Sequence, residues 1–150
     1  MWKRLLSNQR GLTLIELLVV IVILGIIVAI AIPLIGNIID NTKKDAHIAN
    51  AQQIAAAAKM YAVTEGELAD NTTITLAKLQ TENYLDDIKD PSSNKTYDKD
   101  QTRVVIEGGE NAPYKYKVTL VGNGKTYIKG DRDVNELTRD DVNLDGHSSS

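Results

Sequence analysis

The stretch RGLTLIELLVVIVILGIIVAIAIPL, residues 10–34, is almost entirely apolar and yet contains one carboxylate, Glu16. Residues 17–36 carry no charge at all. At about 1.5 Å per residue, a helix over these positions spans roughly 30 Å, which is the thickness of a bilayer core. The stretch therefore predicts a membrane-spanning helix, and Glu16 is the residue that this prediction has to explain.

The residues that precede the apolar stretch are basic. Lys3, Arg4 and Arg10 are accompanied by no acid, so the N-terminus is expected to stay in the cytoplasm. Two common kinds of segment share this layout. A secretory signal peptide would be cut after the small residues of 29–31, but its apolar part usually covers only about 7–15 residues, and Glu16 interrupts this one. A plain single-pass anchor explains everything except the acid.

The position of the carboxylate suggests a partner. An acid at the centre of a membrane helix costs about 2.5–3.5 kcal/mol, although Glu16 lies near the cytoplasmic edge and can reach water. The nearby cations are Arg10 and the amine that cleavage after Gly11 would create. Such a cut makes Leu12 the first residue and Glu16 the fifth, one helical turn away. The same carboxylate can reach the amine of a neighbouring copy, and such a buried pair fixes register more than it adds stability.

Residues 10–18, RGLTLIELL, resemble the class III signal of type IV pilins and pseudopilins. The shared features are a short basic leader that ends in Gly11, a hydrophobic first mature residue and an acid at the fifth mature position. The resemblance continues through Gly25 and Pro33, where this family usually has a glycine and a proline. One departure is that the first mature residue is commonly Phe in the family, whereas here it is Leu12.

The resemblance has consequences for processing and assembly. In that family a membrane peptidase cuts after the glycine and methylates the new amine. The resemblance therefore implies cleavage between Gly11 and Leu12 and N-methylation of Leu12. It also implies that Glu16, together with Thr13, sets the register between subunits, with the carboxylate capturing the amine of an adjacent copy.

The helix is expected to extend beyond the apolar stretch. Apolar residues then recur at spacings of three and four, which predicts one helix from Leu12 to about Thr64, with Gly66 as its stop. Gly25 and Pro33 mark a helix-break site within it, because proline removes a backbone donor and clashes with the preceding turn. The segment between them either kinks in lipid or unwinds locally in a filament.

The rest of the chain predicts a short helix and a small antiparallel sheet. Segment 69–73 is predicted as a loop and 75–85 as a helix. Strands are predicted at 102–107, 114–121 and 125–129. Residues 122–124 are predicted as the hairpin turn between the last two strands. One face of the second strand carries Tyr114, Tyr116, Val118 and Leu120. The predicted fold class is α+β: a long N-terminal helix, its lower half transmembrane or in the filament core, packed on a small antiparallel β-sheet as in the α/β roll of pilins.

These elements predict four segments along the chain. Residues 1–11 form a prepilin leader and residues 12–36 the transmembrane and polymerisation helix. Residues 37–64 continue the helix in amphipathic form. Residues 65–150 form an extracytoplasmic globular domain that ends in an acidic tail.

Few residues indicate catalysis. The chain has no cysteine, which excludes disulfides and thiolate chemistry. His47, expected on the polar side of the long helix, and His147 near the C-terminus lack a serine and an acid at informative spacing. The triplet at 124–126 is similar to the end of a phosphate-binding loop, but Thr119 stands where that loop needs a glycine. The sequence therefore predicts that the chain is not an enzyme.

The acidic tail is the one candidate metal site. Asp141, Asn143 and Asp145 have the spacing of the first half of a calcium loop. Asp131 and Asp133 are candidates to complete a partial calcium site. The alternative, which we prefer, is a solvated acidic tail without a metal, so that no cofactor is certain and calcium is only a candidate.

The sequence thus predicts a structural subunit of a type IV pilus or pseudopilus, held in the inner or cytoplasmic membrane by one helix and then moved into an extracellular filament. The implied partners are other copies of the chain, minor pilins, a prepilin peptidase, an assembly ATPase and a membrane platform protein. Adhesion or motility, DNA uptake and protein secretion remain open as roles. The acidic distal part weighs against direct binding of nucleic acid. The alternative is a single-pass membrane-anchored extracytoplasmic binding domain, calcium-dependent if the tail binds metal.

Overall fold

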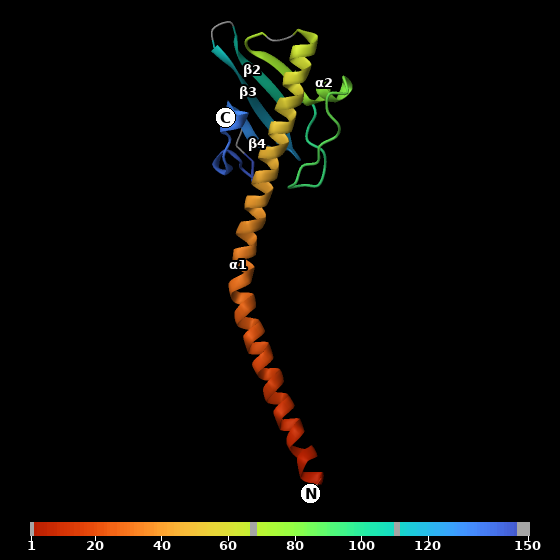
Figure 1. The fold of residues 1–150 in the computed structure, drawn as a ribbon, viewed down its shortest axis with the longest axis vertical. Helices are drawn as coiled ribbons and strands as arrows, with labels where there is room; N and C mark the ends of the chain where they lie inside the picture. Colours follow the sequence, from red (N-terminus) through yellow and green to blue (C-terminus); the bar gives the residue numbers. More distant parts are fainter. Residues whose placement is uncertain (1, 67–68, 110–111, 147–150) are drawn as a thin grey trace. The chain divides into compact units, whose positions relative to one another are not determined.

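The structure, a computed structural model, describes residues 2–66, 69–109 and 112–146, with the side chains of the first helix from Thr13 onward. In this part of the chain a long helix, α1 (Trp2–Glu65), is followed by a small four-stranded antiparallel sheet (Figure 1). The predicted α+β fold class is confirmed. The chain divides into two compact units, Met1–Ile39 and Asp40–Ser150.

The first unit consists of the N-terminal part of α1, which is long and apolar enough to cross a membrane. Its Leu, Ile and Val side chains from residue 14 to residue 39 are between 46% and 69% exposed. The helix continues through Pro33, and no neighbouring atom lies within 4 Å of the position of a Cβ added to Gly25. A soluble surface rarely exposes so large an apolar area, so this unit requires lipid or another protein around it.

The second unit begins with the C-terminal part of α1, where one stripe of the helix becomes buried. Alanines dominate this stripe, so the sheet can approach the helix closely, while Ile54 and Tyr61 supply most of the apolar volume. The helix ends at Glu65, and Gly66 follows with a φ of 70°. A glycine in this left-handed conformation ends a helix without steric cost, which confirms the predicted stop.

The sheet has the order β1-β2-β3-β4, with every neighbouring pair antiparallel. The strands are β1 (Thr72–Thr75), β2 (Arg103–Gly109), β3 (Ala112–Gly122) and β4 (Lys125–Asp133). Asn123 and Gly124 connect β3 to β4 with φ values of 51° and 74°. Two positive φ angles are what a tight two-residue hairpin requires, so the predicted hairpin turn is confirmed.

Two local predictions need correction. Residues 72–73 were predicted in a loop, but they begin β1, because Ile74 is buried and the strand pairs with β2. The helix predicted at 75–85 is shorter: α2 (Leu76–Thr81) starts after Thr75, whose hydroxyl accepts a hydrogen bond from the Lys78 amide. Asn83, with a φ of 60°, prevents its continuation.

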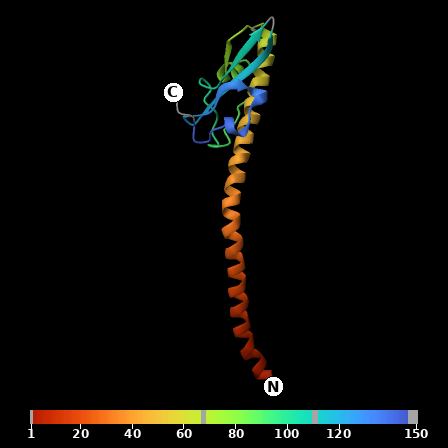
Figure 2. The same ribbon diagram turned by 90° about the vertical axis from the view of Figure 1, so that its left-hand side faces the viewer.

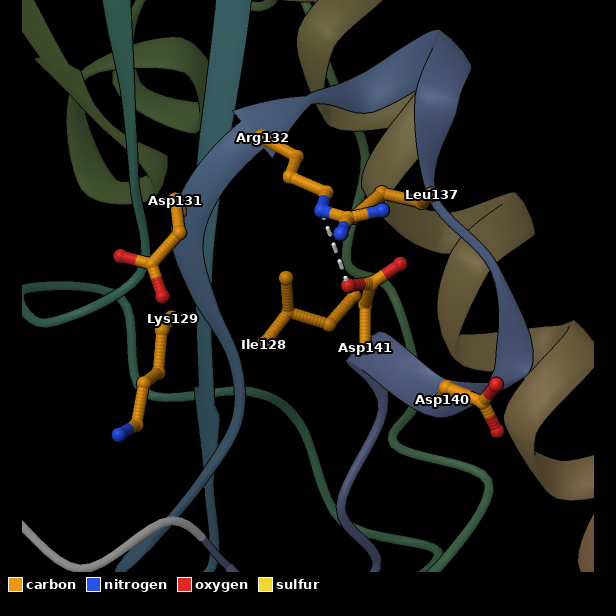
Figure 3. Close-up of a pocket in the computed structure, with 8 residues that line it drawn as sticks. Ile128, Lys129, Asp131, Arg132, Leu137, Asp140 and Asp141 are labelled. Carbon is orange, nitrogen blue, oxygen red and sulfur yellow. Dashed lines mark ion pairs between the residues drawn. The ribbon is translucent and has the colours of Figure 1, made fainter.

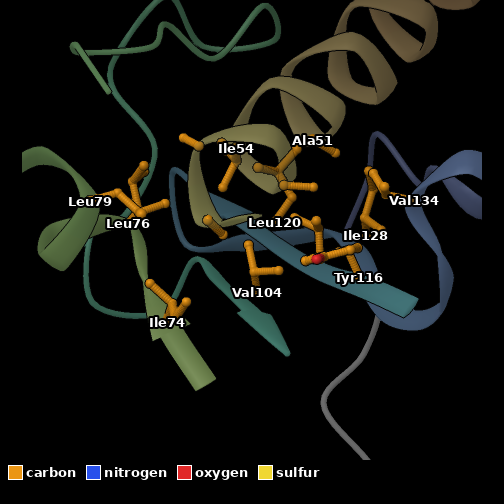
Figure 4. Close-up of a cluster of buried hydrophobic side chains, with 14 of the residues drawn as sticks. Ala51, Ile54, Ile74, Leu76, Leu79, Val104, Tyr116, Leu120, Ile128 and Val134 are labelled. Atoms are coloured by element: carbon orange, nitrogen blue, oxygen red, sulfur yellow. The ribbon is translucent and has the colours of Figure 1, made fainter. Parts of the chain in front are cut away.

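The core of the second unit lies between α1 and one face of the sheet (Figures 2 and 4). As the alternation in β3 predicted, Val118 and Leu120 are fully buried and Tyr116 is nearly so, whereas Tyr114 remains 39% exposed. Figure 4 shows Ala51 and Ile54 of α1 facing side chains that come from the strands. The core therefore fixes the C-terminal part of α1 to the sheet.

The chain after β4 packs onto the second unit through its apolar residues, while the side chains of Asp131, Glu136, Asp140 and Asp145 are exposed. Two 3-10 turns, η1 (Val134–Glu136) and η2 (Arg139–Asp141), are followed by the buried side chain of Val142. The Asn143 amide donates to the Tyr127 carbonyl at 3.0 Å, on the edge of β4. The buried apolar residues among the acids explain why this part of the chain packs onto the sheet.

Candidate functional site

The residues of the predicted processing site lie on the first turns of α1. The backbone of Gly11 and Leu12 is helical, and the side chain of Leu12 lies outside the described residues. Thr13 and Glu16 are exposed on the helix surface. In an α-helix, residues four apart occupy the same face about 6 Å apart along the axis. Glu16 therefore projects from the face that begins at Leu12.

Glu16 is the only charged residue between Thr13 and Ile39. Its neighbours along the helix are exposed Leu, Ile and Val side chains. A carboxylate in lipid or in an apolar protein core requires a cation. The apolar segment supplies none, so a cation that pairs with Glu16 in such surroundings would come from the N-terminal side of Thr13 or from another molecule.

A family model described as the prokaryotic N-terminal methylation motif matches residues 6–32. The chain carries the class III signal of type IV pilins and pseudopilins. The matched residues include Gly11, Leu12, Thr13, Glu16 and Gly25, whereas Pro33 and the candidate calcium ligands lie outside the match. It indicates a structural subunit that is processed by a prepilin peptidase. No curated protein and no solved structure matches the chain.

The candidate calcium ligands lie in the second unit, far from the methylation motif in sequence, and Asp133 has protein partners. Its carboxylate accepts hydrogen bonds from the Tyr116 amide at 2.8 Å and from the amide and side chain of Asn135, each at 2.9 Å. Burial opposes its ionisation, but these hydrogen bonds outweigh burial and lower the pKa of Asp133. Asp133 thus joins β3 to η1.

Asp141 also has partners within the fold. One oxygen accepts from the amide and hydroxyl of Thr138 at 2.8 and 2.9 Å, and the other lies 3.5 Å from Nε of Arg132 (Figure 3). These hydrogen bonds lower the pKa of Asp141. Asp131, Asp140 and Asp141 line one small surface pocket.

The last two candidates form a local turn. The Asn143 side-chain oxygen accepts from the Asp145 amide at 3.0 Å, and its nitrogen donates to the Gly146 carbonyl. Within the described ranges, no three His, Asp or Glu side chains converge as metal ligands do. Calcium binding by the five selected residues stays the untested alternative to a solvated acidic tail without a metal.

His47 is in a different place from the one predicted. Its side chain is 0% exposed, with Nδ1 2.8 Å from the Tyr97 hydroxyl and Nε2 2.8 Å from the Ser92 hydroxyl. The helical spacing contains the signal that was missed, because His47 lies four residues before Ala51 and seven before Ile54, on the stripe that faces the core. His147 lies outside the described residues.

The fold also brings Ser92 and Asp90 to His47, which the sequence spacing did not indicate. In a hydrolytic triad the carboxylate contacts the imidazole nitrogen that faces away from the serine. Here Asp90 Oδ1 lies 3.7 Å from Nε2, the same nitrogen that contacts Ser92, and Nδ1 contacts Tyr97. The geometry is therefore that of a buried polar cluster and not that of a triad.

Proposed function

We propose that this chain is the precursor of a type IV pilin or pseudopilin that is cut after Gly11, N-methylated at Leu12 and polymerised into a helical surface filament. The observation that carries the proposal is the methylation motif at residues 6–32 on a helix whose described Leu, Ile and Val side chains from residue 14 to residue 39 are exposed. A filament subunit needs both features, because the same helix must reside first in lipid and then among other copies.

Glu16 has a defined part in this proposal. Cleavage after Gly11 creates a cationic amine at Leu12, and the carboxylate four residues later is the only charge in the apolar segment of the mature chain. A subunit that enters a growing filament places its amine against the Glu16 carboxylate of a neighbour, with Thr13 beside this contact. An unpaired charge in an apolar core is costly, so the pair selects one register and rejects the others.

Packing of the apolar helices explains why assembly yields a filament. Each copy contacts the next through a different part of its surface, and such heterologous contacts continue indefinitely unless the rotation closes a ring. Residues 12–36 form the filament core, residues 37–64 continue the helix, and residues 65–150 coat the surface, after the leader 1–11 is removed. Gly25 and Pro33 are the positions where the helix bends or unwinds to fit this core.

The partners follow from what the chain lacks and from the motif. Moving the apolar helix out of lipid costs free energy, and the sequence offers no nucleotide-binding loop that could supply it. An assembly ATPase and a membrane platform protein are therefore needed. A prepilin peptidase and minor pilins complete the set. The chain then resides in the inner or cytoplasmic membrane before assembly and on the cell surface afterwards. It serves in adhesion or motility, in DNA uptake or in protein secretion.

The decisive experiment is an intact mass and an N-terminal peptide from protein sheared off the cell surface. We expect a mature chain that begins with N-methylated Leu12. Gly11→Val, which removes the small residue before the cut, should leave the leader attached and the chain in the membrane, whereas Gly25→Ala should still be cut. A sheared chain that begins at Ile32 would indicate an ordinary secreted protein and overturn the proposal.

The second candidate function is a membrane-anchored extracytoplasmic binding domain. The compact unit formed by residues 40–150 favours it, because such a unit can serve a partner without polymerising. In that case the chain begins at Met1, is found only in membranes, and Glu16 has no part in its function.

A further inference from the structure

A buried polar cluster joins three elements of the second unit. His47 comes from α1, Asp90 and Tyr97 come from the loop 89–98 between α2 and β2, and Tyr127 comes from β4. His47 and Asp90 are both 0% exposed. The His47 ring lies against the Tyr127 ring, with centroids 4.2 Å apart. The cluster holds the loop 89–98 against α1 and the sheet.

The hydrogen bonds assign a protonation state to His47. Asn50 Nδ2 donates to the Tyr97 hydroxyl at 3.1 Å, so this hydroxyl is free to donate to His47 Nδ1 at 2.8 Å. The other nitrogen, Nε2, then carries the proton and donates to the Ser92 hydroxyl at 2.8 Å, in the direction of the Asp90 carboxylate. A neutral imidazole that is protonated on Nε2 therefore fits the hydrogen bonds from Asn50 through Tyr97 and His47 to Ser92.

Asp90 remains ionised in this cluster. Its carboxylate accepts from the Ser92 amide at 2.7 Å, the Ser93 hydroxyl at 2.6 Å and the Tyr127 hydroxyl at 2.9 Å. Burial opposes ionisation, but the hydrogen bonds from Ser93, Ser92 and Tyr127 outweigh it and lower the pKa of Asp90. The charge of Asp90 is therefore constant over the range in which a histidine titrates.

A second proton on His47 conflicts with this arrangement. Protonated Nδ1 becomes a donor aimed at the Tyr97 hydroxyl, which already accepts from Asn50. The hydroxyl proton of Tyr97 then loses its acceptor inside a buried site, and a buried donor without a partner is destabilising. We propose that His47 is an acid-sensitive latch, whose protonation releases the loop 89–98 from α1.

The charges around His47 support the direction of this switch. Burial lowers the pKa of His47 to about 4, against the attraction of Asp90 and with a small contribution from Lys43. Burial also raises the pKa of Tyr97, and burial and Asp90 together raise that of Tyr127 to about 12. Among His47, Asp90, Tyr97 and Tyr127, His47 is thus the one group whose charge changes between pH 7 and pH 4.

The sign and size of the effect follow from linkage. The closed loop prefers neutral His47, whereas an opened loop returns it to an ordinary pKa of about 6.5. The loop 89–98 is therefore held closed above pH 6.5, and it opens progressively as the pH falls toward 4. Relative to pH 7.5, the open population rises about fourfold at pH 6 and about 30-fold at pH 5.

Hydrogen exchange of the full-length chain in detergent micelles measures this opening. The reporters are the amides of Asp90, Asn94 and Asp98, which donate to Lys95, Asp90 and Val121 carbonyls. After correction for the intrinsic pH dependence of exchange, their protection should fall about 30-fold between pH 7.5 and pH 5. The amide of Leu120 in the core of the sheet serves as the internal reference and should change far less.

Two variants and one control test the assignment to His47. His47→Gln has no titrating ring and should remove the pH dependence, whereas His147→Gln should leave it intact. If His47→Gln does not fold by circular dichroism, Tyr97→Phe gives the answer. It removes the hydroxyl that opposes protonation in the closed loop, so the pH-dependent loss of protection between pH 7.5 and pH 5 should become smaller than in the unmodified chain. An unchanged pH profile in a folded His47→Gln, or an unchanged loss of protection in Tyr97→Phe, would overturn the latch.

Discussion

Arg139 holds Asp45 in a two-pronged contact, with Nε and Nη2 of the guanidinium each 2.7 Å from a different carboxylate oxygen. The two residues are 94 positions apart, and the contact ties η2 to the C-terminal part of α1. Both side chains are about half exposed. The hydrogen bond from Arg139 lowers the pKa of Asp45, and the same bond raises that of Arg139.

The exposure of this pair limits its contribution to stability. We expect Arg139→Lys, which keeps the charge but loses the planar fork, to lower the Tm by only about 1–2 °C, because exposed ion pairs are weak. Differential scanning calorimetry at low salt and at 0.5 M salt measures the effect, which screening should reduce. The control is Arg132→Lys, because the Nε atom of Arg132 lies 3.5 Å from Asp141 in a looser contact. This substitution should change the Tm less. A drop of more than about 5 °C would mean that Arg139 supports packing as well.

Gly122 is predicted to be intolerant of any side chain. A Cβ at this position would lie 2.8 Å from Asp90 Oδ2 and 3.1 Å from the rings of Tyr127 and Tyr97. We expect Gly122→Ala to destabilise the protein by about 1–3 kcal/mol, because overpacking a filled core forces its neighbours to move. Urea unfolding followed by circular dichroism gives the value.

A matched control for Gly122 lies in the same sheet. An added Cβ at Gly109 meets no atom within 4 Å, and the φ of Gly109 is not in the left-handed region. Gly109→Ala should therefore leave the free energy of unfolding unchanged within about 0.5 kcal/mol. Equal effects of the two substitutions would contradict the assignment of crowding to the Asp90 cluster.

The sequence predicted the elements whose determinants are local. The long helix, its stop at Gly66 and the hairpin at Asn123-Gly124 depend on residues adjacent in the chain. So does the alternation that buries Val118 and Leu120. These signals need no knowledge of the partner, since periodicity and turn chemistry act over a few residues.

The elements that were missed depend on distant partners. Strand β1 has four residues and forms only because β2, about thirty residues later, pairs with it. The burial of His47 depends on Tyr97 and Ser92, which the fold brings from a loop. The packing of the acidic C-terminal part depends on Val142, which is buried in the core of the second unit. Sequence spacing carries no information on such pairings, although the stripe of His47 and Ala51 indicated burial.

Calcium is expected to leave the stability of the chain unchanged. Asp133 and Asp141 already accept hydrogen bonds from backbone amides and neighbouring side chains, and a metal would have to displace these donors. We expect 5 mM calcium to shift the Tm by less than about 1 °C, with magnesium as the control for ionic strength. A rise of several degrees that Asp145→Ala abolishes would instead establish a metal site formed by the acidic residues after β4.

Glu16 is predicted to be necessary for assembly but not for folding or insertion. In the mature chain it is the only acid in the apolar segment, and the amine of Leu12 is the cation that the proposed filament supplies. Glu16→Gln keeps the shape of the side chain and removes its charge, so the sheared filament fraction should fall at least tenfold, whereas cleavage and membrane insertion persist. Quantitative blotting of sheared and membrane fractions measures both quantities.

The control for Glu16 is Asp40→Asn, which removes an acid at the other end of the apolar segment and should leave filaments at the normal level. Glu16→Val separates the two candidate functions most clearly. A filament subunit loses assembly, because the amine of each incoming copy then enters an apolar core without a counter-charge. A plain membrane anchor inserts slightly better, because a charge has been removed from the helix. Normal filaments from both Glu16→Gln and Glu16→Val would exclude the carboxylate from the assembly contact.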